Sequence, residues 1–302
     1  MGRSGKPLKG AILADTGQPT GARPGIHDRA RDTWTVRDPG AHARSVRAMF
    51  ARIAGAYDFM NHLLSLNLDR RWRRRLVARL DADAWEVLDL CAGTGDLSVA
   101  CLRADRGRLL LVSDFCPEML ARGRGKGLGA SHRGRDGVDR PSLLFTADAH
   151  ALPLPNAACD AVMIAFGARN LADVRAGLRE TARVLRPGGQ LLVLEFFRAD
   201  PAATGERRGP VPALRWWLGA TLPLLGRLFA GDGSAYGYLP ASMGRFLSVS
   251  EFAALLAECG LVDIDVERQS LGVAHLVTAR ATGPARAGAE ARERPSEQPL
   301  LR

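Results

Sequence analysis

Residues 86–96 read Glu-Val-Leu-Asp-Leu-Cys-Ala-Gly-Thr-Gly-Asp, a short apolar run that leads into Gly93 and Gly95. The run predicts a buried strand, and the apolar spacing that follows predicts a helix at 95–104. Glycines at such a junction let the backbone approach a ligand where the N–H groups of a helix point outward. A tight turn without any ligand would leave the same pattern, so the two glycines need support from elsewhere in the chain.

Carboxylates at the ends of the next two strands supply that support. Asp114 ends the second strand 21 residues after Gly93, where a carboxylate can accept hydrogen bonds from both hydroxyls of a ribose. Asp148 and Ala149 follow the third strand and suit an adenine amino group. A dinucleotide-binding loop would carry a third glycine where this chain has Ser98. The shorter loop leaves no cradle for a pyrophosphate, which favours S-adenosylmethionine over NAD as the cofactor.

Helical and strand patterns alternate along the chain around this segment. We expect helices at 46–56, 58–65, 69–80, 95–104, 117–123, 171–185 and 249–259. We expect strands at 86–91, 109–114, 142–147, 161–166, 190–196, 262–268 and 272–280. This order is typical of an α/β fold whose parallel sheet is covered by helices on both faces.

Composition limits the interpretation further. The chain has 302 residues, of which 46% are hydrophobic, enough for one large domain or two small ones. Residues 1–45 and 282–302 lack a sustained apolar period, so we expect both ends to be disordered. The five cysteines form no pair or histidine cluster at zinc spacing, and no apolar run is long enough to span a membrane. These features predict a reduced, cytoplasmic protein without a structural metal.

The net charge of +10 suits nucleic acid, an anionic membrane surface or an anionic small molecule. Arginine accounts for 39 of the 42 basic residues, which codon bias in a GC-rich genome would also produce. Methyltransferases that act on amino groups of bases carry an Asp/Asn-Pro-Pro-aromatic motif after the fourth strand, where this chain reads AFGARN at 165–170. We therefore expect no nucleic-acid partner. A nucleic-acid methyltransferase or an RNA-binding module is the distant alternative.

Sequence motifs outside the glycine loop reduce the number of protein families to which the chain could belong. They are MFARIA at 49–54, Tyr57-Asp58 with Asn61, LLS at 63–65, LDRRWRRR at 68–75, AFGARN at 165–170, VLRPGG at 184–189, LEF at 194–196 and YGYLPAS at 236–242. Over about residues 46–280, the chain resembles the ubiquinone/menaquinone-biosynthesis C-methyltransferases. The RPGG turn and the acidic strand ends are shared by many class I methyltransferases. The Tyr-Asp, Phe-Gly-x-Arg-Asn and Tyr-x-Tyr-Leu-Pro motifs together are specific to quinone methylation.

The resemblance implies a class I S-adenosylmethionine-dependent methyltransferase, with a Rossmann-like sheet of seven strands whose last strand is antiparallel. The methyltransferase domain would span 46–281, with a helical substrate cap at 46–80 and an apolar substrate insertion at 200–245. Cofactor contacts carried over by position fall on Gly93, Thr94, Gly95, Asp114, Asp148, Ala149 and Ala165. Ala165 stands where the family often has serine, which removes one hydroxyl contact.

The reaction implied by the resemblance is methylation of a polyprenyl quinol on a ring carbon, with demethylmenaquinol to menaquinol as the main expectation. A ring hydroxyl must lose its proton before that carbon becomes a good nucleophile, so the site must favour an oxyanion. Arg169 and Asn170 are the candidates for holding the quinol oxygen, and Tyr57 for orienting the ring or relaying a proton. An ion pair would also explain Arg169, and a core position would explain Tyr57. The chemistry requires no metal. Methylation in ubiquinone biosynthesis, or of another small aromatic, is the alternative.

The helix predicted at 69–80 is relevant to what the protein surface could contact. Every fourth residue from Leu68 to Leu80 is apolar, and arginines occupy six of the nine positions between them. Helix packing explains the apolar stripe, whereas contact with anionic lipid would explain the arginines. We expect peripheral association with the inner face of the cytoplasmic membrane, and a homodimer is compatible with the sequence. The apolar stretch at 211–230 is either a core helix or a lid over the prenyl tail.

Overall fold

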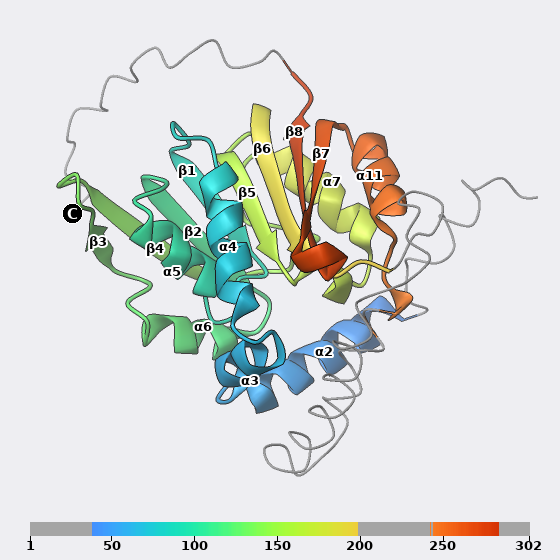
Figure 1. Ribbon diagram of the computed structural model, residues 1–302, viewed down its shortest axis with the longest axis horizontal. Coiled ribbons are helices and arrows are strands. Elements are labelled where there is room, and N and C mark those ends of the chain that lie inside the picture. Colours follow the sequence, from blue (N-terminus) through green and yellow to red (C-terminus); the bar gives the residue numbers. More distant parts are fainter. Residues whose placement is uncertain (1–37, 199–241, 243, 284–302) are drawn as a thin grey trace, which may run out of the picture. The chain divides into compact units, whose positions relative to one another are not determined.

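The computed structural model describes residues 38–198, 242 and 244–283, and its centre is one sheet of eight strands (Figure 1). The strands are β1 (Glu86–Leu90), β2 (Leu109–Asp114), β3 (Ser131–Arg133), β4 (Asp139–Thr146), β5 (Cys159–Ala165), β6 (Leu185–Glu195), β7 (Leu261–Gln269) and β8 (Ala274–Ala281). Their order across the sheet is β3-β4-β2-β1-β5-β6-β8-β7. The tails and the apolar insertion expected from the sequence lie largely outside the described residues.

The sheet is parallel from β4 to β6 and antiparallel around β8. Strands β4, β2, β1, β5 and β6 pair in parallel, while β8 runs antiparallel to both β6 and β7. The first six residues of β5 are all buried, as expected for a strand covered on both faces. The α/β class and the antiparallel last strand are therefore confirmed.

The expected count of seven strands is too low by one, because it misses the short strand β3. β3 pairs antiparallel with β4, and the two form a hairpin within the basic segment 122–142. The turn is closed by the Gly134 N–H, which donates to the Val138 carbonyl at 2.8 Å, and by Arg140, which donates to the Asp136 carboxylate. All three β3 residues are exposed, so no apolar alternation marks the strand in the sequence.

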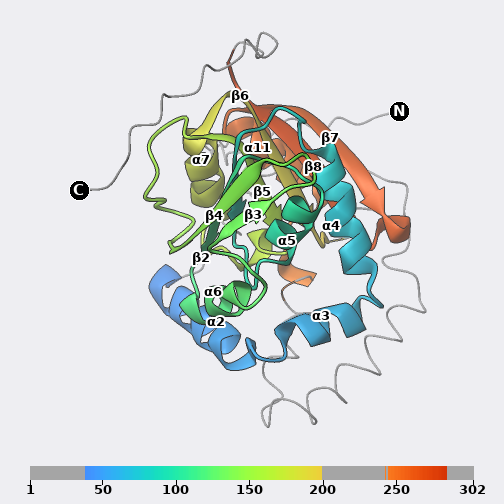
Figure 2. The same cartoon turned by 90° about the vertical axis from the view of Figure 1, so that its left-hand side faces the viewer.

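Helices cover both faces of the sheet and gather near one end of it (Figures 1 and 2). They are α2 (Pro39–Ile53), α3 (Tyr57–Leu64), α4 (Leu68–Arg79), α5 (Asp96–Arg103), α6 (Pro117–Arg124), α7 (Val174–Val184) and α11 (Val249–Glu258), with short 3-10 turns at Ala168–Asn170 and Ser270–Gly272. Helices α4 and α5 lie on one face and α7 and α11 on the other, while α2, α3 and α6 gather near the carboxyl ends of the parallel strands. No helix in this part of the chain is both long and apolar enough to cross a membrane.

Each face of the sheet packs its own apolar core. On one face Trp72 of α4 and Leu97 of α5 pack with Leu192 of β6. On the other face Leu178 of α7 and Phe252 of α11 belong to a second core. The apolar stripe of the arginine-rich helix α4 is thus the face that packs against the sheet. Because both faces of the sheet are packed in this way, the ends of its strands are held in place.

Helix α2 begins at Pro39, whereas the sequence predicts a helix only from residue 46 and a tail up to residue 45. Asp38 caps the helix, because its side chain accepts a hydrogen bond from the Ala41 N–H at 2.8 Å. Pro39 occupies the first turn, where its missing N–H costs no hydrogen bond. Asp-Pro is a sequence signal for the start of a helix. The Gly, His and Arg residues that follow it interrupt the apolar spacing by which a helix is predicted.

Candidate functional site

A cavity of about 460 Å³ opens at the carboxyl ends of β1, β2 and β5. Most of the residues expected to act in binding or catalysis line it: Tyr57, Gly93, Thr94, Asp114, Asp148, Ala149, Ala165 and Asn170. Gly95 and Arg169 were also expected there, but they are not among the lining residues. The fold therefore brings together segments that are far apart in the sequence, and the two exceptions have other contacts.

The carboxylate of Asp114 is held at the end of β2 by backbone N–H groups. Its Oδ2 accepts from the Gly93 N–H at 2.7 Å, and its Oδ1 accepts from the Cys116 N–H at 2.8 Å. Burial raises the pKa of Asp114. Gly93 has φ +59°, and a Cβ there would lie 3.4 Å from Met119 and 3.8 Å from the Tyr57 ring. The glycine loop and Tyr57 are therefore close neighbours across the cavity.

Gly95 serves the packing beneath the loop. Its φ is +77°, and a Cβ at this position would come within 2.1 Å of the Leu128 Cδ1 atom. Any side chain would displace Leu128, which is buried in the core beside α5. The packing of Leu128 therefore requires glycine at position 95, whether or not a ligand binds to the loop.

Asp89 is a cavity residue that the sequence analysis did not select. Its Oδ2 accepts from the Ser98 N–H at 3.0 Å and from the Ser98 hydroxyl at 2.6 Å. Its Oδ1 is buried and has no hydrogen-bond partner among the described residues. Burial raises the pKa of Asp89 to about 7. An unpaired buried carboxylate oxygen beside a cavity is costly, and a cationic ligand would relieve that cost.

Asp148 also lines the cavity, and its side chain is half exposed. The ring Nδ1 of His150 lies 2.5 Å from Asp148 Oδ1, and the His150 N–H donates to the same oxygen at 2.9 Å. The ring Nε2 lies 3.0 Å from the Asp173 carbonyl oxygen. His150 therefore fixes the Asp148 carboxylate between two segments of the chain, a contact that no sequence pattern indicated.

Arg169 forms a buried ion pair. Its Nη1 donates to Glu195 Oε1 at 2.6 Å and to the Phe166 carbonyl at 2.7 Å, and its guanidinium lies 5.7 Å from the centre of the Phe196 ring. The Glu195 side chain is fully buried. The Nε of Arg169 is also buried and has no hydrogen-bond partner among the described residues. Asn170 follows in the chain and does line the cavity.

Tyr57 stands at the start of α3 with its ring against Phe50, at 5.7 Å between ring centres and nearly perpendicular. Burial raises the pKa of Tyr57, and the nearby charges of Arg169 and Arg73 oppose that rise. The Asn61 side chain, one turn further along α3, also acts to lower the pKa of Tyr57. The phenol is therefore a neutral hydrogen-bond donor placed close to two cations.

Arg73 is a second buried cation that the sequence analysis missed. It lines the cavity, pairs with Asp69 one turn earlier on α4, and lies 5.5 Å from the centre of the Phe166 ring. Phe166 in turn stacks on Phe196 at 4.6 Å between ring centres. The four-residue spacing of an acid and a base was the available signal, but it is hidden in a run of five arginines among six residues.

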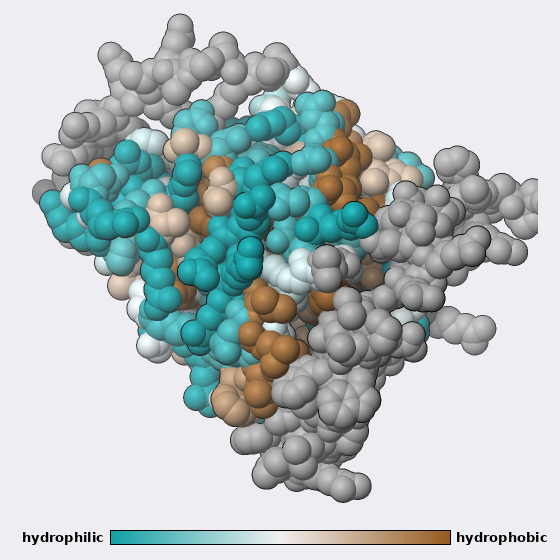
Figure 3. Space-filling model, in the orientation of Figure 1, coloured by the Kyte–Doolittle hydropathy of each residue, from teal (hydrophilic) through white to brown (hydrophobic). Residues whose placement is uncertain are grey.

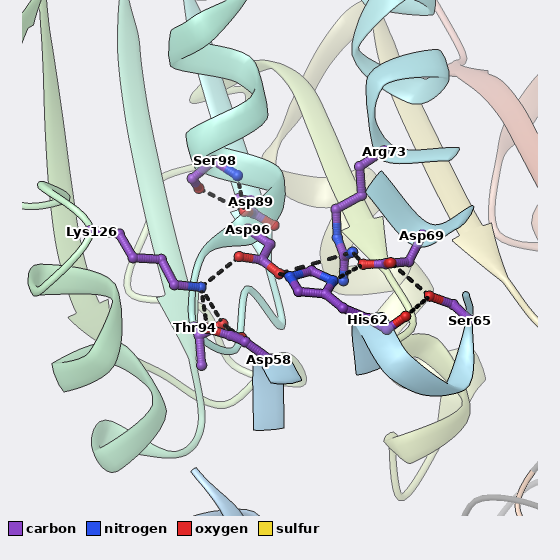
Figure 4. Close-up of polar contacts among 10 residues, drawn as sticks. All are labelled: Asp58, His62, Ser65, Asp69, Arg73, Asp89, Thr94, Asp96, Ser98 and Lys126. Carbon is purple, nitrogen blue, oxygen red and sulfur yellow. Dashed lines mark hydrogen bonds and ion pairs between the residues drawn. The ribbon is translucent and has the colours of Figure 1, made fainter. Parts of the chain in front are cut away.

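A cluster of charged side chains ties the helices to the glycine loop (Figure 4). His62 Nδ1 lies 2.8 Å from Asp69 Oδ2, and His62 Nε2 lies 3.7 Å from Asp96 Oδ2. Ligand atoms of these three residues lie within 4.8 Å of one another, but Arg73 and Lys126 already pair with the two carboxylates. We therefore interpret the cluster as an ion-pair network.

Comparisons with known proteins agree with this geometry. The model of the ubiE/COQ5 methyltransferase family matches residues 39–280. A protein of Geobacter sulfurreducens named ubiquinone/menaquinone biosynthesis C-methyltransferase UbiE is 38% identical over 235 residues, which is 77% of this chain and 87% of that protein. The demethylmenaquinone methyltransferase of Thermus thermophilus is 41% identical over 227 residues, which is 75% of this chain and 96% of that one.

Solved structures support the fold. A SAM-dependent methyltransferase from Thermotoga maritima matches with a TM-score of 0.50 at 15% identity, covering 78% of this chain and 99% of its own. At that identity the match bears on the fold alone. The family model covers most of the chain and the two relatives exceed one third identity, so this chain is a methyltransferase of the ubiE/COQ5 family.

Proposed function

We propose that the protein methylates a ring carbon of a polyprenyl quinol, with demethylmenaquinol as the acceptor and S-adenosylmethionine as the methyl donor. The observation that carries the proposal is the placement of three carboxylates at the strand ends of the cavity, with a buried phenol and an arginine reaching it from the helices. Asp89, Asp114 and Asp148 lie on the side of the strand ends, while Tyr57 and Arg73 approach from the helices. A cationic donor and an acceptor that becomes anionic need surroundings of opposite sign.

The strand side suits S-adenosylmethionine. The unpaired Asp89 Oδ1 would accept a hydrogen bond from the ammonium group, and Asp114 from the ribose hydroxyls. Asp148 and Ala149 would face the adenine, and the glycine loop at Gly93 would let the ligand lie against the backbone. Bound there, S-adenosylmethionine supplies an activated methyl group and a neutral leaving group.

The helical side suits a quinol. Asn170 and the Tyr57 hydroxyl would donate hydrogen bonds to the ring oxygen as it loses its proton. The pKa of Tyr57 is raised by burial, so the phenol keeps its own proton and stabilises the oxyanion as a donor. Arg169 is fixed by Glu195, and its charge would act on the same oxygen from behind the Phe166 backbone. These residues orient the ring, exclude water and lower the pKa of the quinol hydroxyl.

The surface near α3 and α4 supports a peripheral membrane location. Figure 3 shows hydrophilic residues over α4 and hydrophobic residues gathered below it, where α3 lies. Phe59 and Leu66 are 55% and 53% exposed. Arg70 and Arg74 of α4 are exposed beside them. Exposed apolar side chains next to bases fit the cytoplasmic surface of an anionic bilayer, where a prenylated substrate would be found.

The decisive test is methyl transfer with purified protein. Reduced demethylmenaquinone and a reduced polyprenyl benzoquinone would each be incubated with S-adenosylmethionine, and the products measured by mass spectrometry. We expect a gain of one methyl group on the naphthoquinol ring. Methylation of the benzoquinol alone would move the assignment to ubiquinone biosynthesis, and methylation of neither would refute the proposed function.

A further inference from the structure

Lys126 is an exception in this chain. The sequence contains only three lysines, and the other two are Lys6 and Lys9. Lys126 follows α6 in the basic segment 122–142, and its contacts reach residues beside the cavity although no residue of this segment is among the lining residues. Its Nζ lies 2.6 Å from Asp58 Oδ2, 2.5 Å from Asp96 Oδ1 and 2.8 Å from Thr94 Oγ1. An ammonium group has three N–H donors, and here each has an acceptor.

The three acceptors belong to different parts of the site (Figure 4). Thr94 is in the glycine loop, Asp96 is the first residue of α5, and Asp58 is the second residue of α3. The Thr94 hydroxyl also donates to Asp58 Oδ1, so the loop and α3 are joined directly as well as through the ammonium. A planar guanidinium could not direct its donors in the same three directions.

Fixing Asp58 also fixes Tyr57, because the two residues are adjacent at the start of α3. His62, one turn further along α3, lies between Asp69 and Asp96 and attaches the second turn of the helix. Both turns of α3 are thus bound to polar or charged groups on α4, α5 and the glycine loop. Leu128, two residues after Lys126, fills the space under Gly95.

We infer that Lys126 is a positioning residue, which holds α3 against the glycine loop so that Tyr57 faces the strand side of the cavity. The part that concerns Tyr57 and the acceptor rests on the proposed function. The part that concerns the glycine loop requires only that this loop contacts the methyl donor. Because Lys126 holds both the glycine loop and α3, it links the conformation of the donor site to the conformation of the acceptor site.

The test compares Lys126→Met and Lys126→Arg with the matched control Arg124→Met, which removes an exposed base from the same segment. Calorimetric titration with S-adenosylhomocysteine measures the donor site, and hydrogen–deuterium exchange of 57–64 measures the attachment of α3. For Lys126→Met we expect about tenfold weaker binding, from the loss of charge-assisted hydrogen bonds, and faster exchange in α3. Lys126→Arg should restore part of both, and Arg124→Met should match the parent.

Asp58→Asn separates positioning from a general loss of stability. This variant keeps the contacts of Lys126 with Thr94 and Asp96, so we expect faster exchange in α3 with a smaller change in ligand affinity. The inference would be overturned if Lys126→Met bound S-adenosylhomocysteine as tightly as the parent and its α3 exchanged at the parent rate. If Lys126→Met does not fold, an unchanged α3 exchange rate in Asp58→Asn would overturn it instead. Neither measurement uses a quinol. A parent protein that binds S-adenosylhomocysteine but methylates no quinol would therefore refute the proposed function and leave the role of Lys126 to be decided by these variants.

Discussion

The cavity has two walls that are held in different ways. The strand wall consists of Asp89, Gly93, Asp114 and Asp148, and local hydrogen bonds fix its carboxylates, as when Asp114 accepts from the Cys116 N–H. The helical wall includes Tyr57 and Arg73, and ion pairs fix it: Arg73 pairs with Asp69 within α4, and Lys126 pairs with Asp58 beside Tyr57. The sheet therefore sets the strand wall, whereas the helical wall depends on side chains that a single substitution can release.

The largest effect is expected where the charge of Arg169, beside the ends of β5 and β6, is removed. Arg169→Met should lower kcat by about 10²–10³, the usual loss for one preorganised group that stabilises an oxyanion. It should also destabilise the fold by about 3–5 kcal/mol, because the buried Glu195 carboxylate loses the guanidinium that balances its charge. Single-turnover methylation across pH, with thermal melts of the same samples, measures both.

The double variant Arg169→Met with Glu195→Gln provides the control. It removes both charges, so stability should recover while turnover stays low. Higher pH should partly restore the rate, because more quinol ionises without help from the protein. A double variant that methylates at the parent rate would show that Arg169 has only a structural role.

On the strand wall, Asp114→Ala should weaken S-adenosylhomocysteine binding by about 10- to 100-fold, equivalent to roughly 1.5–3 kcal/mol for hydrogen bonds to a charged group. Calorimetric titration checks this. Asp139→Ala, which removes an exposed carboxylate from β4, is the control and should bind as the parent does. Unchanged affinity in Asp114→Ala would remove the ribose contact from the proposal.

Asp89 should make the strand wall sensitive to pH. Its pKa in the folded protein is about 7, above the ordinary value of 3.8. The ligand-free protein should therefore lose stability as pH rises from about 4 to 7, because the unfolded chain ionises this group first, and the loss is at most about 4 kcal/mol. Binding of S-adenosylhomocysteine should strengthen as pH rises through 7. Asp89→Asn should bind more weakly and show neither trend, and melts and titrations at pH 5 to 8 would reveal whether it does.

A smaller effect is expected from the phenol of the helical wall. Tyr57→Phe keeps the ring packed on Phe50 and removes one neutral donor, so kcat should fall about tenfold while affinity for S-adenosylhomocysteine is unchanged. Steady-state kinetics with calorimetry distinguishes the two quantities. If Tyr57 is only a packing residue, the variant will turn over at the parent rate.

The smallest effect concerns the outer surface beside the helical wall. Replacing Arg70, Arg71 and Arg74 by serine should weaken binding to anionic vesicles by about 1 kcal/mol per base, and the parent should detach as salt rises. Sedimentation with anionic and neutral vesicles measures this. Equal binding of the parent to both kinds would eliminate the electrostatic contribution and favour codon bias as the origin of these arginines.

The same two walls show what can be predicted from the sequence. Gly93, Asp114 and Asp148 could be selected because parallel strands bring their carboxyl ends to one edge and each residue follows an apolar run. Arg73 could not, because its place depends on how α4 crosses the sheet. The partner of Arg169 is 26 residues away on another strand, and no local period connects the two. Even Asp89, within the glycine motif, gives no sign in the sequence that one of its oxygens lacks a partner.

The β3–β4 hairpin has a consequence for the behaviour of the chain in solution. An unpaired strand at the edge of a sheet can pair with another molecule and start aggregation. Here that edge is β3, which is three residues long, exposed at every residue, and contains His132 and Arg133. It covers part of the longer strand β4, so little of that backbone is offered to a neighbouring sheet. The basic segment thus protects an edge of the sheet from self-association, a role that explains part of its charge without any ligand.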